Sequence, residues 1–219
     1  EAAIDEIASN YRPSPQVEAV IRSQIEEWCD RGKVARTLED AYSNLSNEEL
    51  LQSAKNRHLR GNLKSMSKKQ LVKAVVSFRE ITAQDVLDRA IAEGAYQVEH
   101  LRVVWEAGGM LRIPCRNVHV LNDVPMPCFP STLLFHKGED YIVSMPKEVY
   151  DALEGVDWKQ ERETARGIDR AMRYLDAMVD FRGVVPLEDG ISELNSQFPN
   201  VDAQLMYLTI VARLKNERL

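Results

Sequence analysis

Residues 45–76 of the chain read LSNEELLQSAKNRHLRGNLKSMSKKQLVKAVV. Twice in this stretch a serine is followed three positions later by a Glu or Gln: Glu49 follows Ser46, and Gln70 follows Ser67. A serine at a helix start accepts a hydrogen bond from the backbone N–H three residues on, and the Glu or Gln side chain bonds back to the serine N–H. Each pair therefore predicts a helix start. Since apolar residues follow both starts at helical spacing, residues 43–78 predict a helix, an extended link and a second helix.

The same segment is basic, although the chain as a whole is acidic. Between positions 50 and 79 there are eight Lys or Arg residues and no Asp or Glu, whereas the formal net charge of the chain is −6. The remaining residues hold 20 Lys and Arg against 34 acidic residues. A basic block within an acidic body indicates a localised anion-binding face. The alternative interpretation is a solvated helical surface.

Most of the other patterns are also helical. Ser14 and Pro15 are typical of a helix start, and they precede an apolar stripe at helical spacing that consists of Val17, Val20, Ile21, Ile25, Trp28 and Cys29. Helical patterns recur near 38–42, 82–93, 97–107, 147–155, 158–181, 187–194 and from 202 onward. Two apolar runs around a Gly-containing turn at 132–146 predict a β-hairpin. Residues 111–130, with prolines spread through them, predict a loop or irregular β segment.

These patterns predict a mainly α fold with a minor β-hairpin. The order of elements in residues 82–152 is that of a winged helix, and three helices in 164–218 are similar to a second, truncated one. The second helix of the first unit, in the place of a recognition helix, displays a mixed and partly acidic face, so a scaffold role is expected there; this face holds Gln97, Glu99, His100, Arg102 and Glu106. We predict four domains: an N-terminal helical region (1–42), the helix-extended-helix module (43–80), a winged-helix-like domain (81–155) and a C-terminal helical unit (156–219).

Several function classes find no support in the sequence. No apolar run approaches the roughly 18 residues of a membrane helix, and three widely spaced cysteines favour a reducing, cytoplasmic setting over a disulfide scaffold. Phosphate-binding Gly-rich loops, nucleophile elbows and zinc-protease motifs are missing, so we predict no enzyme and no cofactor. Cys115, His119 and Cys128, with His136 nearby, have a spacing that is poor for zinc, and no metal site is predicted.

Residues 43–76 resemble the SAP-like N-terminal domain of the Rho transcription termination factor. The positions that fit its pattern are Leu45, Leu50, Leu51, Ala54, Leu59, Gly61, Met66, Lys69, Leu71 and Ala74. The match covers about one sixth of the chain, and its link, Arg60 to Lys64, departs from the wider SAP group. The rest resembles Firmicute-type bacterial proteins in which such a module precedes winged-helix-like segments. The resemblance implies a bacterial, cytoplasmic protein and nucleic-acid binding through the link and the second helix.

The predicted function is non-catalytic, regulatory binding of DNA or RNA through phosphate contacts. Lysine and arginine neutralise phosphates without reading sequence, and the absence of aromatic residues between 43 and 77 weakens a base-stacking platform. The alternative is a protein-interaction adaptor that has no nucleic-acid affinity. The predicted phosphate-contacting residues are Arg57, Arg60, Lys64, Lys68, Lys69 and Lys73.

Overall fold

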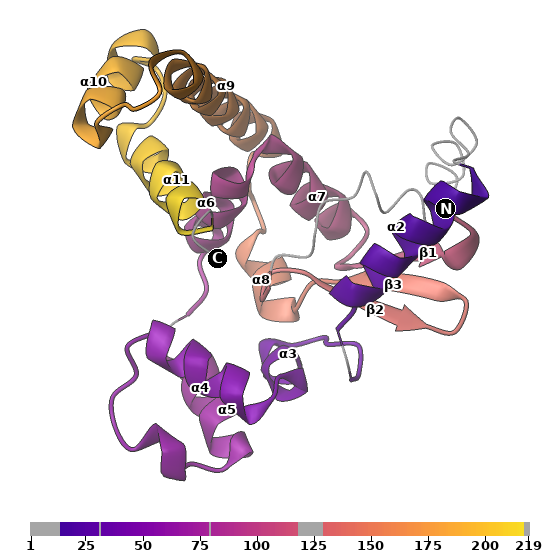
Figure 1. Cartoon of the computed structure of the whole chain (residues 1–219). Coiled ribbons are helices and arrows are strands. Elements are labelled where there is room, and N and C mark those ends of the chain that lie inside the picture. Colours follow the sequence, from indigo (N-terminus) through magenta and orange to yellow (C-terminus); the bar gives the residue numbers. More distant parts are fainter. Residues whose placement is uncertain (1–13, 31, 79, 118–128, 217–219) are drawn as a thin grey trace. The chain divides into compact units, whose positions relative to one another are not determined.

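The computed structural model describes residues 14–30, 32–78, 80–117 and 129–216 (Figure 1). It is mainly helical with a small antiparallel sheet, which confirms the predicted fold class. The helices of the first half are α2 (Pro15–Trp28), α3 (Leu38–Asn44), α4 (Asn47–Asn56), the 3₁₀ helix η1 (Leu63–Ser65), α5 (Lys68–Ser77), α6 (Ala83–Glu93) and α7 (Ala95–Glu106). Three strands, β1 (Met110–Pro114), β2 (Leu133–Lys137) and β3 (Asp140–Ser144), precede α8 (Lys147–Ala152), α9 (Trp158–Arg182), α10 (Leu187–Gln197) and α11 (Ala203–Asn216).

The chain divides into two compact units. Unit 1 comprises Glu1–Thr82 and Val103–Glu154, and unit 2 comprises Ala83–Arg102 and Gly155–Leu219. Each unit therefore draws on two separate stretches of sequence, and α7 has residues in both. The four predicted domains stay a prediction.

The sheet of unit 1 has the strand order β1-β3-β2. Lys137 of β2 pairs with Asp140 of β3, so the two strands are joined by Gly138 and Glu139 alone, as expected for a hairpin. Gly138 has a φ of +65°, a conformation that glycine adopts without the clash of a Cβ. Strand β1, which falls partly in the segment predicted to be irregular, pairs with β3 at the edge of the sheet. Pro114 is the last residue of β1. It has no N–H to donate, and an edge strand tolerates this loss.

A small apolar core lies between this sheet and the segment that follows α2. Phe135 and Ile142 pair across the hairpin and pack with Ala35, Ala41 and Leu133. Hydrogen bonds tie the end of α2 to the same sheet, since the Asp30 N–H donates to the Leu134 carbonyl over 2.6 Å. Helix α2 is therefore held against the hairpin by its C-terminal end.

Helices α3, α4 and α5 form the helical part of unit 1. Helix α5 contacts both α3 and α4. Leu50 and Ala54 of α4 and Leu71 and Val75 of α5 are buried. The two helices predicted within residues 43–78 are present with these apolar positions inside, but the link between them, predicted to be extended, contains the 3₁₀ helix η1.

Unit 2 is a set of helices in which α9 contacts α6, α10 and α11. The Asp169 carboxylate of α9 accepts the Ala95 N–H over 2.9 Å and so supports the first turn of α7. Ile168 and Met172 of α9 are buried, while Val179 is 40% exposed and does not belong to the core.

Two predicted faces are corrected by the structure. In α2, Ile21 and Ile25 are buried, but Val17 and Val20 are 46% and 57% exposed, because only the C-terminal end of the helix meets the sheet.

In α7, Gln97 and His100 were expected on the exposed face of a recognition helix. Both are buried instead. Burial lowers the pKa of His100 to about 4, so its imidazole is neutral near pH 7 and brings no positive charge to a surface.

Candidate nucleic-acid interface

Helices α4 and α5 begin with the hydrogen bonds that the sequence predicts. The Ser46 hydroxyl accepts the Glu49 N–H over 3.3 Å, and the Glu49 carboxylate accepts the Ser46 N–H over 2.7 Å. At α5 the Ser67 hydroxyl accepts the Gln70 N–H over 3.4 Å, and the Gln70 side chain accepts the Ser67 N–H over 2.9 Å. The two boxes fix where the helices start and so set which residues of α5 face outward.

The link between the two helices is a defined turn followed by η1. The His58 N–H donates to the Lys55 carbonyl and the Leu59 N–H to the Ala54 carbonyl, which are the two bonds of a Schellman C-cap. His58 has a φ of +56°, in the left-handed region that glycine or asparagine usually occupies at this position. Gly61, with a φ of +118°, redirects the chain a second time. The link is therefore compact and leads directly into the basic start of α5.

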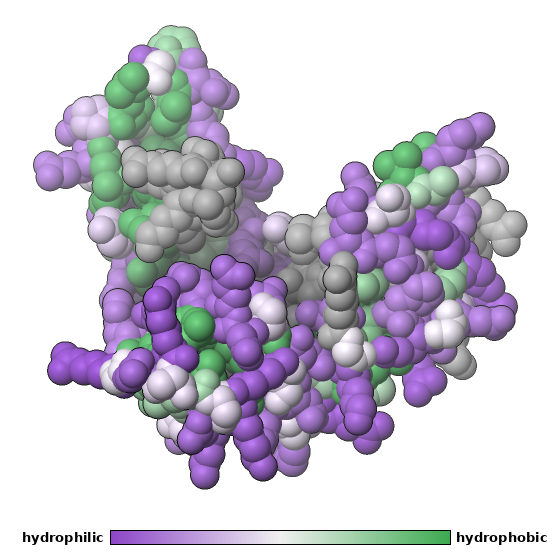
Figure 2. Space-filling model, turned by 60° about the horizontal axis from the view of Figure 1, so that its bottom comes forward, coloured by the Kyte–Doolittle hydropathy of each residue, from purple (hydrophilic) through white to green (hydrophobic). Residues whose placement is uncertain are grey.

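Five of the six predicted phosphate-contacting residues are exposed. We call them the basic surface, and they are Arg60, Lys64, Lys68, Lys69 and Lys73. Figure 2 shows hydrophilic side chains projecting where α4, η1 and α5 come forward. Within the part of the chain that the structure describes, none of these five side chains forms a salt bridge. Their charges are thus available to an anion from solution.

The sixth predicted residue, Arg57, lies half-buried between the helices. Its guanidinium donates to the Val75 carbonyl at the end of α5 over 3.1 Å and to the Tyr42 hydroxyl over 2.6 Å. The same group lies 5.4 Å from the centre of the Tyr42 ring. Arg57 therefore joins α3, α4 and α5, whereas the members of the basic surface project from them.

The charges at the start of α5 oppose its helix dipole. Lys68 and Lys69 occupy the first two helical positions, where the free N–H groups already carry partial positive charge, and no acidic residue lies in this turn. Lys69 and Lys73 are four residues apart, so two like charges share one face. Both arrangements are unfavourable for the isolated helix, and a bound anion would relieve both.

The positive charge at the start of α5 affects the carboxylate of Glu49. The pKa of Glu49 is lowered, chiefly by its hydrogen bonds with Ser46 and also by the positive charge of Lys68. The start of α4 therefore lies within electrostatic reach of the start of α5. Glu49 is already engaged by the capping box, so Lys68 keeps its own donors free.

The other sequence-based candidates do not assemble into a site. His119 and Cys128 of the possible zinc spacing lie outside the described residues. Among the residues that are described, no three His, Cys, Asp or Glu side chains are placed to hold a metal ion. On α7, Glu99 is paired with Arg102 and lies 3.9 Å from Arg162, so its carboxylate is neutralised within unit 2.

Comparisons with known proteins identify no relative. No family model, no curated protein and no solved structure matches the chain. The resemblance of residues 43–76 to the Rho N-terminal domain therefore stays a prediction. In the described ranges, no helix combines the length and apolar character needed to cross a membrane.

Sequence reasoning did not separate Arg57 from the lysines around it. The signal that could have done so is position: Arg57 is the C-cap of α4, directly after a helix whose buried face includes Ala54. A long side chain at that place reaches the corresponding end of the neighbouring helix. Its partners, a carbonyl of α5 and the hydroxyl of Tyr42, are 18 and 15 residues away in sequence and are not apparent without the fold.

Proposed function

We propose that the basic surface binds the phosphate backbone of a nucleic acid. The single observation that carries this proposal is the pair Lys68 and Lys69 at the exposed start of α5, in a first turn that has no acidic residue. Lysine at this position costs helix stability, typically a few tenths of a kcal/mol to about 1 kcal/mol. An anion bound there interacts with the lysines and with the free N–H end of the helix at once.

The spread of the charges favours an extended polyanion over a single small anion. Lys69 and Lys73 are separated by four residues of helix, on the order of 6 Å along its axis. Arg60 and Lys64 continue the charge into the link and η1. A row of cations of this kind neutralises successive phosphates and releases their counterions.

Base reading is not expected at this surface. Its members are lysines and one arginine, and residues 43–77 include no Phe, Tyr or Trp side chain on which a base could stack. Contacts to phosphates alone position a nucleic acid without selecting its sequence. We therefore expect single-stranded RNA, single-stranded DNA and duplex DNA all to bind, the duplex most tightly because its charge density is highest.

The test is binding of labelled oligonucleotides of these three kinds to the whole chain at low salt. The variant is Lys68→Glu/Lys69→Glu. The matched control is Lys159→Glu/Arg170→Glu, which makes the same change in net charge at two exposed positions of α9 in unit 2. The α5 variant is expected to lose about 10²-fold in affinity or more, and the control much less.

The comparison of the two variants decides between a local site and a general charge effect. Equal losses in both would contradict the proposal, because net charge alone would then explain binding. Failure of the unmodified chain to bind any of the three oligonucleotides at low salt would also contradict it. That result would favour the alternative, an adaptor that binds a protein partner.

A further inference from the structure

A second group of side chains in unit 1 has the geometry of an activated thiol. Cys115 follows β1, His136 belongs to β2, and Glu26 belongs to α2. The Cys115 Sγ lies 3.4 Å from the His136 Nε2, and the His136 Nδ1 lies 2.8 Å from the Glu26 Oε1. A nucleophile, a base within hydrogen-bond reach of it and a third group that orients the base are the elements of nucleophilic catalysis.

The sheet register brings these residues together. His136 pairs with Tyr141 across the hairpin, and their rings stack with centres 4.7 Å apart. On the other side of β3, Pro114 pairs with Asp140, and the next residue, Cys115, donates its N–H to the Glu139 carbonyl over 2.8 Å. The thiol and the imidazole thus flank the same end of β3.

The hydrogen bonds set the tautomer of His136. Because the Glu26 carboxylate accepts from Nδ1, the proton of the neutral ring lies on Nδ1, and Nε2 presents a lone pair to the Cys115 thiol. The Tyr141 hydroxyl also donates to the Glu26 Oε1, over 2.6 Å, and so holds this carboxylate in place. The imidazole is therefore oriented to take a proton from the thiol.

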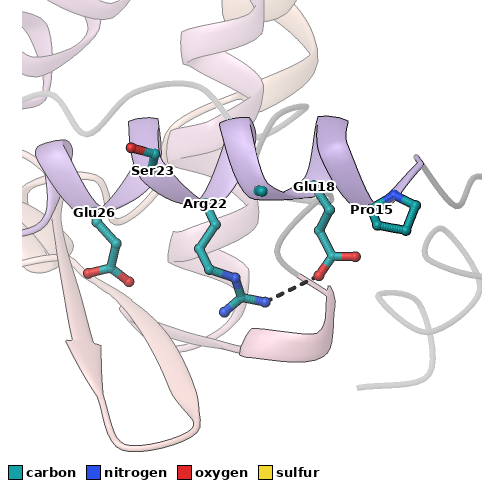
Figure 3. Close-up of a pocket in the computed structure, with 6 residues that line it drawn as sticks. Pro15, Glu18, Arg22, Ser23 and Glu26 are labelled. Atoms are coloured by element: carbon teal, nitrogen blue, oxygen red, sulfur yellow. Dashed lines mark hydrogen bonds and ion pairs between the residues drawn. The ribbon is translucent and has the colours of Figure 1, made fainter.

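A hollow on α2 borders this group. It has a volume of about 550 Å³ and is lined by Pro15, Glu18, Ala19, Arg22, Ser23 and Glu26. Figure 3 shows Glu18, Arg22 and Glu26 projecting from the same side of α2, with Arg22 bonded to Glu18. The Arg22 guanidinium also donates to the Cys115 carbonyl over 3.1 Å. Two of the lining residues, Arg22 and Glu26, thus touch Cys115 or its base.

The other described cysteine provides an internal contrast. Cys29, at the end of α2, is also half-buried, but among the described residues no imidazole lies within hydrogen-bond reach of it. Burial, with the nearby carboxylates of Glu26 and Asp30, raises the pKa of Cys29 to about 12. A thiol of this kind is unreactive near neutral pH. The feature that distinguishes Cys115 is its base.

We propose that Cys115 is the nucleophile of an acyl-transfer site, with His136 as its general base and Glu26 as a positioning residue, and that the acyl donor is a small ester or thioester bound beside α2. In the acylation step, the Sγ attacks the carbonyl carbon of the donor while the His136 Nε2 takes the thiol proton. The bond between the carbonyl carbon and the alcohol oxygen, or thiol sulfur, of the donor then breaks. The leaving alcohol or thiol carries away the proton from His136, and a thioester remains on Cys115.

A proton-relay mechanism suits this thiol better than a standing thiolate does. The pKa of Cys115 is raised, chiefly by burial, with Asp140 and Glu26 adding to the effect and Arg22 opposing it. The resting thiol therefore keeps its proton, 3.4 Å from the His136 Nε2. In such a pair the proton moves only as the nucleophile attacks, and general-base help of this kind contributes about 10²–10⁴-fold to a rate.

The experiment follows acetylation of the whole chain by p-nitrophenyl acetate near neutral pH. Mass spectrometry of the peptides reports the addition of one acetyl group at each cysteine. Cys115 is expected to react about 10²-fold faster than Cys29, and faster in the folded chain than in the chain unfolded by urea. The substitution His136→Gln keeps a polar side chain of similar length without a base, and it should lower the Cys115 rate by about 10²-fold while circular dichroism stays unchanged.

The role of Glu26 is tested by Glu26→Gln, which keeps a hydrogen-bond acceptor but removes the negative charge. This charge favours protonated His136, so its loss should move the acid limb of the rate–pH profile to lower pH. A purely structural role would leave that limb in place. The groups facing the pair, Arg22 on α2 and Asp140 and Tyr141 on β3, are unchanged in this variant.

Two outcomes would overturn the proposal. One is acetylation of Cys115 that is no faster than that of Cys29, or no faster in the folded chain than in the unfolded one. The other is a Cys115 rate that His136→Gln leaves unchanged. If His136→Gln unfolds the chain, the pH profile of Glu26→Gln decides instead, and an unshifted acid limb counts against the proposal.

Discussion

Helices α4 and α5 start with the same hydrogen-bonded box, but the charges in their first turns are opposite. Helix α4 follows Ser46 with Asn, Glu48 and Glu49, and it ends with Lys55 in its last turn. Helix α5 follows Ser67 with Lys68, Lys69 and Gln70 and has no basic residue in its last turn. The first arrangement agrees with the helix dipole at both ends, and the second opposes it at the start.

The difference separates residues that stabilise this region from residues that are free to bind. On the α4 side, the Glu49 carboxylate bonds with the Ser46 N–H, and the Arg57 C-cap bonds with the Val75 carbonyl and the Tyr42 hydroxyl. In α5, Lys69 and Lys73 meet none among the described residues. Surfaces that are selected for binding commonly keep charges that lower stability. This contrast fits the proposal that the α4 side of the pair contributes stability and the α5 side binds phosphates.

The largest stability effect is expected at Arg57. Arg57→Met keeps the apolar stem but removes the donors to the Val75 carbonyl and the Tyr42 hydroxyl, so unfolding free energy should fall by about 2 kcal/mol. Urea unfolding followed by circular dichroism measures this change. Oligonucleotide affinity at a fixed salt concentration should fall much less than it does in Lys68→Glu/Lys69→Glu. A larger loss of affinity in Arg57→Met would place Arg57 in the binding surface. It would contradict the division between residues that stabilise this region and residues that bind.

The two serine caps should be equivalent. Ser46→Ala and Ser67→Ala each remove the acceptor for one backbone N–H and should each cost about 1 kcal/mol in unfolding free energy. Urea unfolding of both variants against the unmodified chain makes the comparison. Both serines accept the N–H three residues on, and the Ser67 hydroxyl also donates to the Gln70 Oε1. A cost at one serine that is several times larger than at the other would contradict the view that the boxes are interchangeable.

Reversing the charge at the second helical position should change the stability of the chain in opposite directions in the two helices. Lys69→Glu should stabilise the chain by about 0.5–1 kcal/mol, because it agrees with the dipole and pairs with Lys73 four residues on. Glu48→Lys, at the same position of α4, should destabilise it by a similar amount. The check is thermal or urea unfolding at low salt. Changes of equal sign in the two variants would show that the dipole is not the cause.

Lowering the pH should reduce the stability that the start of α4 contributes, but not the stability that the start of α5 contributes. The pKa of Glu49 is lowered in the fold, so its stabilising contribution is present above its unfolded pKa, near 4.5, and is lost as pH falls through the lower folded value. Gln70, its counterpart in α5, does not titrate. Unfolding free energies of the unmodified chain and of Glu49→Gln at pH values on both sides of this window isolate the effect. We expect the difference between the two chains to shrink toward low pH; a constant difference would contradict the assignment.

Local signals made much of this region predictable. Both capping boxes, the hairpin turn and the buried faces of α4 and α5 depend on residues a few positions apart, so periodicity and cap chemistry were sufficient to locate them. The exposure of Lys68, Lys69 and Lys73 follows from the same periodicity.

Contacts between distant segments were not predictable in the same way. The partners of Arg57, the burial of His100 and the pairing of β1 with β3 each depend on which elements pack together, and no local pattern encodes that. The thiol group is the clearest case. The sequence analysis considered Cys115 and His136 only as possible zinc ligands, and Glu26, which bonds to His136, lies on a distant helix. Val17 and Val20 of α2 show the converse, because helical spacing marks a stripe but does not say how far the neighbouring sheet extends along it.

The most direct test of the central claim is the dependence of duplex DNA affinity on salt. With up to five phosphate contacts from the basic surface, the logarithm of the association constant should fall with the logarithm of salt concentration with a slope of about 3–5 in magnitude. Lys69→Gln should reduce that slope by about 1, whereas Lys159→Gln in α9 should leave it unchanged. A slope near zero, or equal slopes for the unmodified chain and Lys69→Gln, would contradict the claim that α5 presents a phosphate-binding face.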